Sequence, residues 1–298
     1  MIKMNVSKVK FQDVQKLPIS ILRYPGGKSR IIKQIAPYLP KEFEEYREPM
    51  VGGGSVFLYL KRLYPERKYW INDINYDLIS FWKSLRDEPS ELVKAIREIK
   101  QTTQDGKTLY HKLKKEYGQG KNDFEIGLRF YILNRITYSG LIDAGGFSEL
   151  SFKTRFKLNL IDNLSKISPL LSDTKITCGP FEAVLNQSGH NVFMFVDPPY
   201  DYARISKIYG KKGENGTNFN HSALRNILEK SEHKWLLTYD DSLIVRKYYK
   251  KIAYIDSKTV QYGTNKPGNG IPEGKAKIGN ELFIRNYRLS GGQQRKIV

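Results

Sequence analysis

The sequence predicts an α/β fold with a helical insertion, on the basis of three observations. Short apolar runs alternate with amphipathic stretches along most of the 298 residues, which is the pattern of strands covered by helices. Between about residues 89 and 164 the strand-like runs are absent, and the helical stretches are rich in Lys and Arg. Some apolar runs end directly in a glycine turn or a carboxylate, where open α/β sheets bind ligands.

The segment before the insertion alternates regularly between helix and strand. A first helix is stopped by Pro37 and Pro40, because proline cannot continue a helix. A glycine turn then separates a strand from the next helix. Helices are expected at 29–38, 55–63 and 76–85, and strands at 46–50 and 68–72.

The insertion and the segment after it complete the predicted elements. Helices are expected at 92–99, 108–117 and 124–138 within the insertion, then at 181–185, 222–230 and 242–249. Strands are expected at 175–177, 192–196, 235–239 and 281–288, and a loose tail at 290–298. The polar, Gly-rich segments 201–220 and 257–280 lack periodicity and are predicted as long loops, which in compact domains usually have a function.

Composition limits the class of protein. Fifty Lys and Arg against 31 Asp and Glu leave a net charge of +19, which favours a polyanionic partner over a generically basic protein. Cys178 is the single cysteine, so an internal disulfide and a Cys-based zinc site are excluded and a cytoplasmic location is expected. The four histidines lack metal-ligand spacing, so no metal is expected. No secretory signal or membrane-spanning apolar run is predicted.

A carboxylate follows directly after a wholly apolar run. Residues 192–196 read Val-Phe-Met-Phe-Val, and Asp197-Pro-Pro-Tyr200 comes next. This predicts a buried central strand with Asp197 at its C-terminal edge. The two prolines fix the backbone and remove two N–H donors, so the segment presents carbonyl acceptors.

Such a segment suits a planar aromatic amine. Asp197 and the carbonyl of Pro198 can accept the two amino hydrogens, while the Tyr200 ring stacks on the base. These acceptors draw the nitrogen towards a tetrahedral geometry and free its lone pair to attack a methyl sulfonium. The alternative interpretation is a strand ended by a Pro-Pro turn, with Tyr200 in the core.

Two glycine turns predict ligand contacts near the N-terminus. Gly52 to Gly54 lie between a strand and a helix, and Asp73 follows 21 residues after Gly52, where it can accept from ribose hydroxyls. The alternative is an ordinary tight turn. Gly26-Gly27-Lys28 lacks the glycine of a phosphate-binding loop, because Leu22 stands there, but its N–H groups and cation suit a carboxylate.

Taken together and in this order, the motifs resemble the DNA adenine methylases of the Dam type. The resemblance extends to Asn280-Glu-Leu-Phe-Ile-Arg-Asn-Tyr287. It implies a doubly wound, Rossmann-like methyltransferase sheet that binds S-adenosylmethionine, with residues 1–85 and 166–298 catalytic and residues 86–165 a helical target-recognition insertion. The implied substrate is adenine N6 in double-stranded DNA, reached by base flipping.

The resemblance also implies roles for individual residues. Tyr24 and Lys28 hold the methionine part of the cofactor, Gly52 and Gly54 pass beneath it, Asp73 binds the ribose, and Phe181 lies against the adenine. Asp197, Pro198 and Tyr200 are the catalytic residues. The expected DNA contacts are Arg135, Tyr138, Lys153, Arg155, Arg204 and Lys207; for Lys153 and Arg155 a solvated basic face is the alternative.

Three departures from the family pattern affect these expectations. Pro180 stands where an Asp normally precedes Phe181, which removes one hydrogen bond to the cofactor adenine. Tyr24 stands where Trp is frequent, and Met50 where Phe is frequent. The segment 138–147 lacks the arginine usual in the recognition insertion, so a GATC target is not assigned.

Several functions remain open from the sequence alone. A restriction-modification enzyme with a cognate endonuclease and a solitary methylase are both compatible with the motifs. The enzymatic alternatives are methylation of RNA adenine, of cytosine N4 or of a glutamine side chain. Asp before Pro-Pro-Tyr favours DNA adenine among these. A DNA-binding homologue without activity is the alternative from another class.

Overall fold

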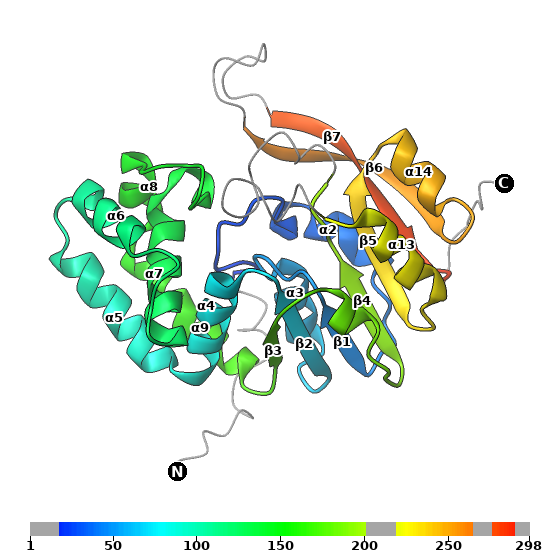
Figure 1. The fold of residues 1–298 in the computed structure, drawn as a ribbon, viewed down its shortest axis with the longest axis horizontal. Coiled ribbons are helices and arrows are strands. Elements are labelled where there is room, and N and C mark those ends of the chain that lie inside the picture. Colours follow the sequence, from blue (N-terminus) through cyan, green and yellow to red (C-terminus); the bar gives the residue numbers. More distant parts are fainter. Residues whose placement is uncertain (1–17, 201–218, 265–275, 290–298) are drawn as a thin grey trace.

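A seven-stranded sheet organises the molecule (Figure 1). The computed structural model describes residues 18–200, 219–264 and 276–289. The strand order is β3-β2-β1-β4-β5-β7-β6, with β1 to β5 parallel and β7 antiparallel to both β5 and β6. The strands are β1 Glu45–Glu48, β2 Lys68–Asp73, β3 Lys175–Cys178, β4 Val192–Val196, β5 Lys234–Asp240, β6 Tyr254–Thr264 and β7 Ala276–Arg285.

The strand order reverses between β1 and β4, which both lie in the middle of the sheet. The chain runs outward from β1 through β2 to β3, and later from β4 to β5. In open α/β sheets this switch point leaves a crevice at the carboxyl ends of the two strands. The predicted doubly wound, Rossmann-like methyltransferase fold is confirmed.

Strand β4 explains the wholly apolar run in the sequence. All five of its residues are buried. Phe193 and Phe195 pack into one hydrophobic core, and Val192, Met194 and Val196 pack into a second core on the other face. Because helices cover both faces of the sheet, both alternating sets of side chains must be apolar.

The helices around the sheet largely match the predicted ones. They are α3 Ser55–Leu63, α4 Tyr76–Asp87, α10 Glu182–Leu185, α13 His221–Lys230 and α14 Leu243–Tyr249. The single helix predicted at 29–38 is wrong: the chain forms η2 Lys28–Arg30, α2 Ile32–Ile35 and η3 Ala36–Tyr38. Ile31 leaves helical geometry at φ −108° and ψ 11°, and Pro37 has no N–H to continue the hydrogen-bond pattern.

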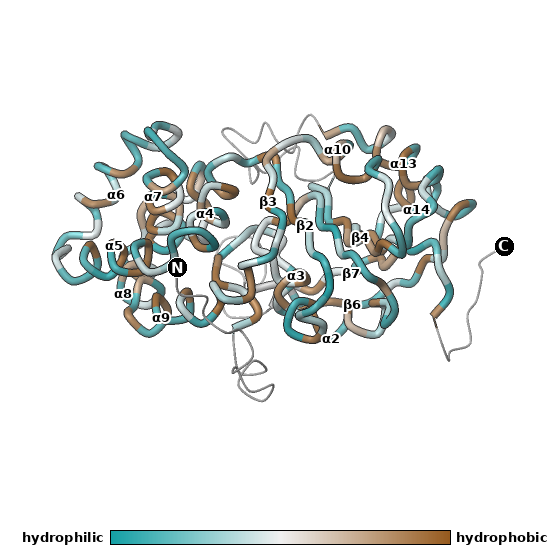
Figure 2. The backbone as a smooth tube through the Cα atoms, turned by 90° about the horizontal axis from the view of Figure 1, so that it is seen from below, coloured by the Kyte–Doolittle hydropathy of each residue, from teal (hydrophilic) through white to brown (hydrophobic). Residues whose placement is uncertain are grey.

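The middle of the chain forms a helical group beside the sheet (Figures 1 and 2). It contains α5 Pro89–Thr102, α6 Gly106–Lys115, α7 Asp123–Ile136, η4 Tyr138–Gly140, α8 Glu149–Arg155 and α9 Leu158–Ile167, followed by η5 Ser168–Leu171. Helix α4 connects the two parts, because it packs on β2 and β3 and also on α7. Helices α8 and α9 were not predicted; they are short, and burial of Ile161, Leu164 and Ile167 stabilises α9.

The prediction of a loop over 257–280 is wrong for its two ends. Residues 257–264 belong to β6 and residues 276–280 to β7, which pair antiparallel. Ser257, Lys258 and Thr259 are exposed, because β6 is the edge strand. Strand β6 is stabilised by its hydrogen bonds to β7 and shows no alternation of apolar residues that would have predicted it. Residues 265–275 and the predicted loop residues 201–218 lie outside the described residues. No helix in the described part of the chain is both long and apolar enough to span a membrane.

Candidate active site

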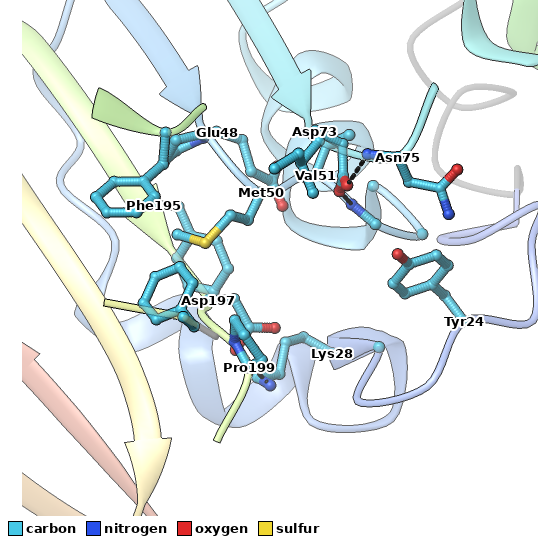
Figure 3. Close-up of a pocket in the computed structure, with 18 of the residues that line it drawn as sticks. Tyr24, Lys28, Glu48, Met50, Val51, Asp73, Asn75, Phe195, Asp197 and Pro199 are labelled. Carbon is cyan, nitrogen blue, oxygen red and sulfur yellow. Dashed lines mark hydrogen bonds and ion pairs between the residues drawn. The ribbon is translucent and has the colours of Figure 1, made fainter. Parts of the chain in front are cut away.

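A cavity of about 430 Å³ lies at the carboxyl ends of β1 to β4, at the switch point of the sheet (Figure 3). Parallel strands bring their carboxyl ends to one edge, so motifs far apart in the sequence meet there. The cavity wall includes every residue that the sequence predicted for cofactor binding, together with Asp197: Tyr24, Lys28, Gly52, Gly54, Asp73 and Phe181.

The glycine turn and Asp73 form one hydrogen-bonded unit. Asp73 Oδ2 accepts from the Gly52 N–H at 3.0 Å, and Oδ1 accepts from the Asn75 N–H at 3.0 Å. Gly52 has φ +47°, and a Cβ there would lie 2.8 Å from the Tyr24 ring. Gly52 and Asp73, which are 21 residues apart, therefore meet where β1 and β2 end at the edge of the sheet. Burial raises the pKa of Asp73, and the backbone N–H groups oppose that rise.

Asp197 is anchored through one of its two oxygens. Its Oδ1 lies 2.7 Å from Lys28 Nζ and accepts from Thr238 Oγ1 at 2.7 Å and from the Tyr200 hydroxyl at 3.2 Å. Burial raises the pKa of Asp197, the Lys28 ammonium lowers it, and the neighbouring Glu281 carboxylate raises it again. Lys28 is thus placed in the cavity as expected, with an ion-pair partner that the sequence did not predict.

Glu281 of β7 is a second carboxylate in this network. Its side chain is fully buried, lies 3.3 Å from Lys28 Nζ and accepts a hydrogen bond from the Tyr200 hydroxyl. Sequence reasoning missed Glu281 and Thr238. The available signal was an acidic residue inside an otherwise apolar strand, within the Asn280-Glu-Leu-Phe-Ile segment.

The ring of Tyr200 belongs to the core in this structure. It is 4% exposed and stacks on Tyr239, with ring centroids 5.4 Å apart and an angle of 25° between the ring planes, while its hydroxyl contacts Asp197 and Glu281. Among the described residues, Pro199 lines the cavity, whereas Pro198 and Tyr200 do not. The sequence placed this ring against a base; here its hydroxyl holds the acidic network.

The cavity wall is acidic although the protein is strongly basic. Within the described part of the chain, four acidic side chains line it against one ammonium group: Glu48, Asp73, Glu182 and Asp197 against Lys28. The whole chain carries a net charge of +19. Burial raises the pKa of Glu48 well above its usual value, so the acidic character of the lining comes mainly from Asp73, Glu182 and Asp197. Such a lining suits a cationic ligand rather than a polyphosphate. No group of three or more His, Cys, Asp or Glu side chains among the described residues could hold a metal ion.

A larger groove of about 780 Å³ separates the N-terminal segment from the helical group. Arg135, Tyr138 and Arg155 line it, and Tyr24 and Lys28 lie on the walls of both this groove and the acidic cavity. Lys153 is exposed, pairs with Glu149 at 3.1 Å and does not line the groove in the described structure. Arg204 and Lys207 lie outside the described residues.

The groove contains an arginine cluster that the sequence only partly predicted. Arg135 is 7% exposed and donates to the carbonyl of Ile21, so it also holds the N-terminal segment. Arg23, which was not predicted, donates to the carbonyl of Thr137. Burial, together with the positive charges of Arg155 and Arg135, lowers the pKa of Arg23 to about 10. Guanidinium groups that repel each other in this way give a site that an anion would stabilise.

Comparison with known proteins identifies the family. Residues 24–263 match the family model of the D12 class N6 adenine-specific DNA methyltransferases. The chain belongs to this family. The match includes the cavity, the helical group and the strands β1 to β5.

Relatives of this D12-class enzyme come from distant sources. It is 30% identical to the type II methyltransferase M.MjaIII of Methanocaldococcus jannaschii, over 69% of this chain and 84% of the relative. It is 26% identical to the type II methyltransferase M1.LlaDCHI of Lactococcus lactis, over 89% and 94%. Identity to a DNA adenine methylase of Vibrio cholerae is 25%, over 78% and 84%.

Membership of the D12 class decides between the enzymatic substrates that the motifs left open. The enzyme acts on the N6 amino group of adenine in DNA, and not on cytosine N4, RNA adenine or a glutamine side chain. The resemblance to DNA adenine methylases is thereby confirmed.

Proposed function

We propose that this D12-class enzyme uses S-adenosylmethionine as its methyl donor and binds that cofactor in the acidic cavity. The acidic lining carries the proposal: a sulfonium is a cation, and the wall offers four carboxyl groups and a single ammonium. The cavity also offers an aromatic ring at Phe181 and a glycine turn whose backbone a ligand can approach.

Different residues of the cavity wall would bind different parts of this cofactor. Asp73 takes the ribose hydroxyls, since its two oxygens are fixed by backbone N–H groups and retain capacity to accept more hydrogen bonds. Phe181 takes the adenine face. Tyr24 and Lys28 take the methionine part, and Gly52 and Gly54 pass beneath. When bound, the cofactor supplies the electrophilic methyl group.

Asp197 and the Pro198 carbonyl orient the adenine amino group for attack. Among the described residues, the contacts of Asp197 all fall on Oδ1, which leaves Oδ2 to accept one amino hydrogen. Held in this way, the amino nitrogen would direct its lone pair at the methyl group that a bound cofactor would supply, and the proton lost from the nitrogen on methylation would pass to solvent. Aimed acceptors favour this by holding the lone pair in line.

Duplex DNA lies in the groove between the two parts of the enzyme in this proposal. Arg23, Arg135 and Arg155 meet phosphates there, and an extruded adenine passes from the groove towards Asp197, since Tyr24 and Lys28 border both spaces. Residues 86–165 form the target-recognition region, and residues 1–85 and 166–298 form the catalytic region.

The test is transfer of a labelled methyl group from S-adenosylmethionine to adenine-containing duplex DNA. Asp197→Ala is expected to abolish transfer, while calorimetry still detects cofactor binding. Thr238→Val serves as a milder variant that removes one hydrogen bond to Oδ1 and reduces the rate without abolishing it. Full activity of Asp197→Ala would refute the assigned mechanism.

The names of two relatives, both type II methyltransferases, support a role in restriction-modification for this chain as well. In this proposal the modified site protects DNA from a cognate endonuclease. Sequencing the DNA of an expressing host for N6-methyladenine gives the target site. That DNA is then expected to resist an endonuclease of the same specificity, and cleavage at modified sites would contradict this role.

A further inference from the structure

Glu182 is a carboxylate at the cavity wall that the assigned chemistry does not use. It is the first residue of α10, directly after Phe181, and lines the cavity. Its Oε2 atom is buried and, within the described part of the chain, has no hydrogen-bond partner. Leaving a buried charged acceptor without a donor costs free energy. Because Glu182 lines the cavity, a ligand whose donor reaches its carboxylate would offset this cost.

The order of strands at the sheet edge tells which part of the ligand that donor belongs to. The cavity runs along β3, β2, β1 and β4, about 14 Å for three spacings of ~4.8 Å. Asp197 after β4 marks the methyl end, and Asp73 at the end of β2 marks the ribose. The adenine therefore lies at the β3 end, where Phe181 and Glu182 are.

Two aromatic rings form an apolar surface at the β3 end of the cavity. Phe181 and Phe219 both line the cavity, with ring centroids 5.0 Å apart. Such rings bind the faces of a nucleobase without distinguishing its edge. Polar groups must read the edge, and Pro180 offers neither a side-chain acceptor nor a backbone N–H. Glu182 is the acidic group next to these rings.

We propose that Glu182 accepts a hydrogen bond from the exocyclic amino group of the cofactor adenine and so selects an aminopurine cofactor. The inference rests on the proposed use of S-adenosylmethionine. A 6-oxo purine presents an oxygen where adenine presents the amino group, and the Glu182 carboxylate repels that oxygen. In this proposal Glu182, directly after Phe181, supplies the acceptor that the family's Asp directly before Phe181 would supply and that Pro180 lacks.

Calorimetry with S-adenosylhomocysteine and its 6-oxo analogue, S-inosylhomocysteine, tests the proposal without relying on turnover. The wild type is expected to bind the adenine compound about ten-fold or more tightly than the analogue. In Glu182→Gln the ratio is expected to fall to about two-fold or less, because an amide can accept from an amino group and donate to an oxygen. Glu91→Gln, on the exposed side of α5, keeps the wild-type ratio.

Pro180→Asp added to Glu182→Gln is expected to raise the ratio again, since an acidic acceptor returns beside Phe181. Equal affinity of the wild type for both compounds overturns the proposal, and this result needs no variant to fold. An unchanged ratio in Glu182→Gln also overturns it. Either result leaves the proposed function standing, whereas failure of the wild type to bind S-adenosylhomocysteine at all refutes the use of S-adenosylmethionine.

Discussion

At the scale of single residues, the candidate active site has fewer positive than negative charges. Lys28 is the one ammonium that contacts both Asp197 and Glu281 in the described structure. Burial raises the pKa of Asp197, and the second carboxylate, Glu281, raises it further, so the single ammonium of Lys28 does not bring it down to its usual value. A carboxylate held in this way is a stronger acceptor than a fully neutralised one, because less of its charge is already satisfied.

The pH dependence of the reaction follows from that arrangement. In the proposed mechanism Asp197 accepts an N–H only as a carboxylate, so kcat/KM is expected to fall as the pH drops through its pKa, which burial and Glu281 both raise. Glu281→Gln removes one of these causes and is expected to move the acid limb of the kcat/KM profile to lower pH. The amide still accepts from the Tyr200 hydroxyl.

Glu281→Asp is the matched control for this experiment, because it keeps the charge on β7. The acid limb is expected to stay close to that of the wild type in this variant. A limb that does not move in Glu281→Gln would show that Glu281 has no influence on the ionisation of Asp197.

At the scale of elements, the sequence predicted those parts that bury apolar side chains with a clear period. Helix α3 and strand β4 have the expected bounds, because the apolar residues that each element buries lie within its own sequence. Edge strand β6 and helix α8 could not be predicted, since pairing and neighbouring helices stabilise them. Single residues of the cavity wall could be predicted from local motifs. The contact between Lys28 and Glu281 could not, because these residues are far apart in the sequence and meet only in the folded structure.

The packing of α4 against α7 joins the sheet to the helical group and gives a prediction of stability. A Cβ at Gly127 of α7 would lie 2.7 Å from Phe81 Cα and from the Ser80 carbonyl oxygen in α4. Gly127→Ala is therefore expected to lower the free energy of unfolding by about 1–3 kcal/mol, although alanine favours helix. Urea denaturation measures the change.

Gly179→Ala is the control for this substitution, since a Cβ there meets no atom within 4 Å. It is expected to change the free energy of unfolding by less than about 1 kcal/mol. Equal stability of Gly127→Ala and Gly179→Ala would show that the two helices can move apart without cost.

At the scale of the whole molecule, charge is separated between two adjoining spaces. In the described structure four carboxyl groups and one ammonium line the acidic cavity, and the groove beside it holds arginines whose charges repel each other. A cationic cofactor and a polyanionic substrate can thus be bound side by side by one chain. Lys28 and Tyr24 line both spaces, and the proposed mechanism brings the methyl group and the target base together at this boundary.

The contribution of the groove to DNA binding can be measured through its dependence on salt. Arg155 is exposed at the end of α8 and lines the groove. If it contacts one phosphate, Arg155→Ala weakens binding of duplex DNA and reduces the slope of log K against log salt concentration by about 0.9, because one fewer counterion is released. Lys94→Ala on α5, which is outside the groove in the described structure, removes the same charge and is expected to leave the slope within about 0.3 of the wild-type value. Equal slopes for all three proteins would mean that DNA follows another face of the enzyme, and the path proposed from the groove to Asp197 would then have to be abandoned.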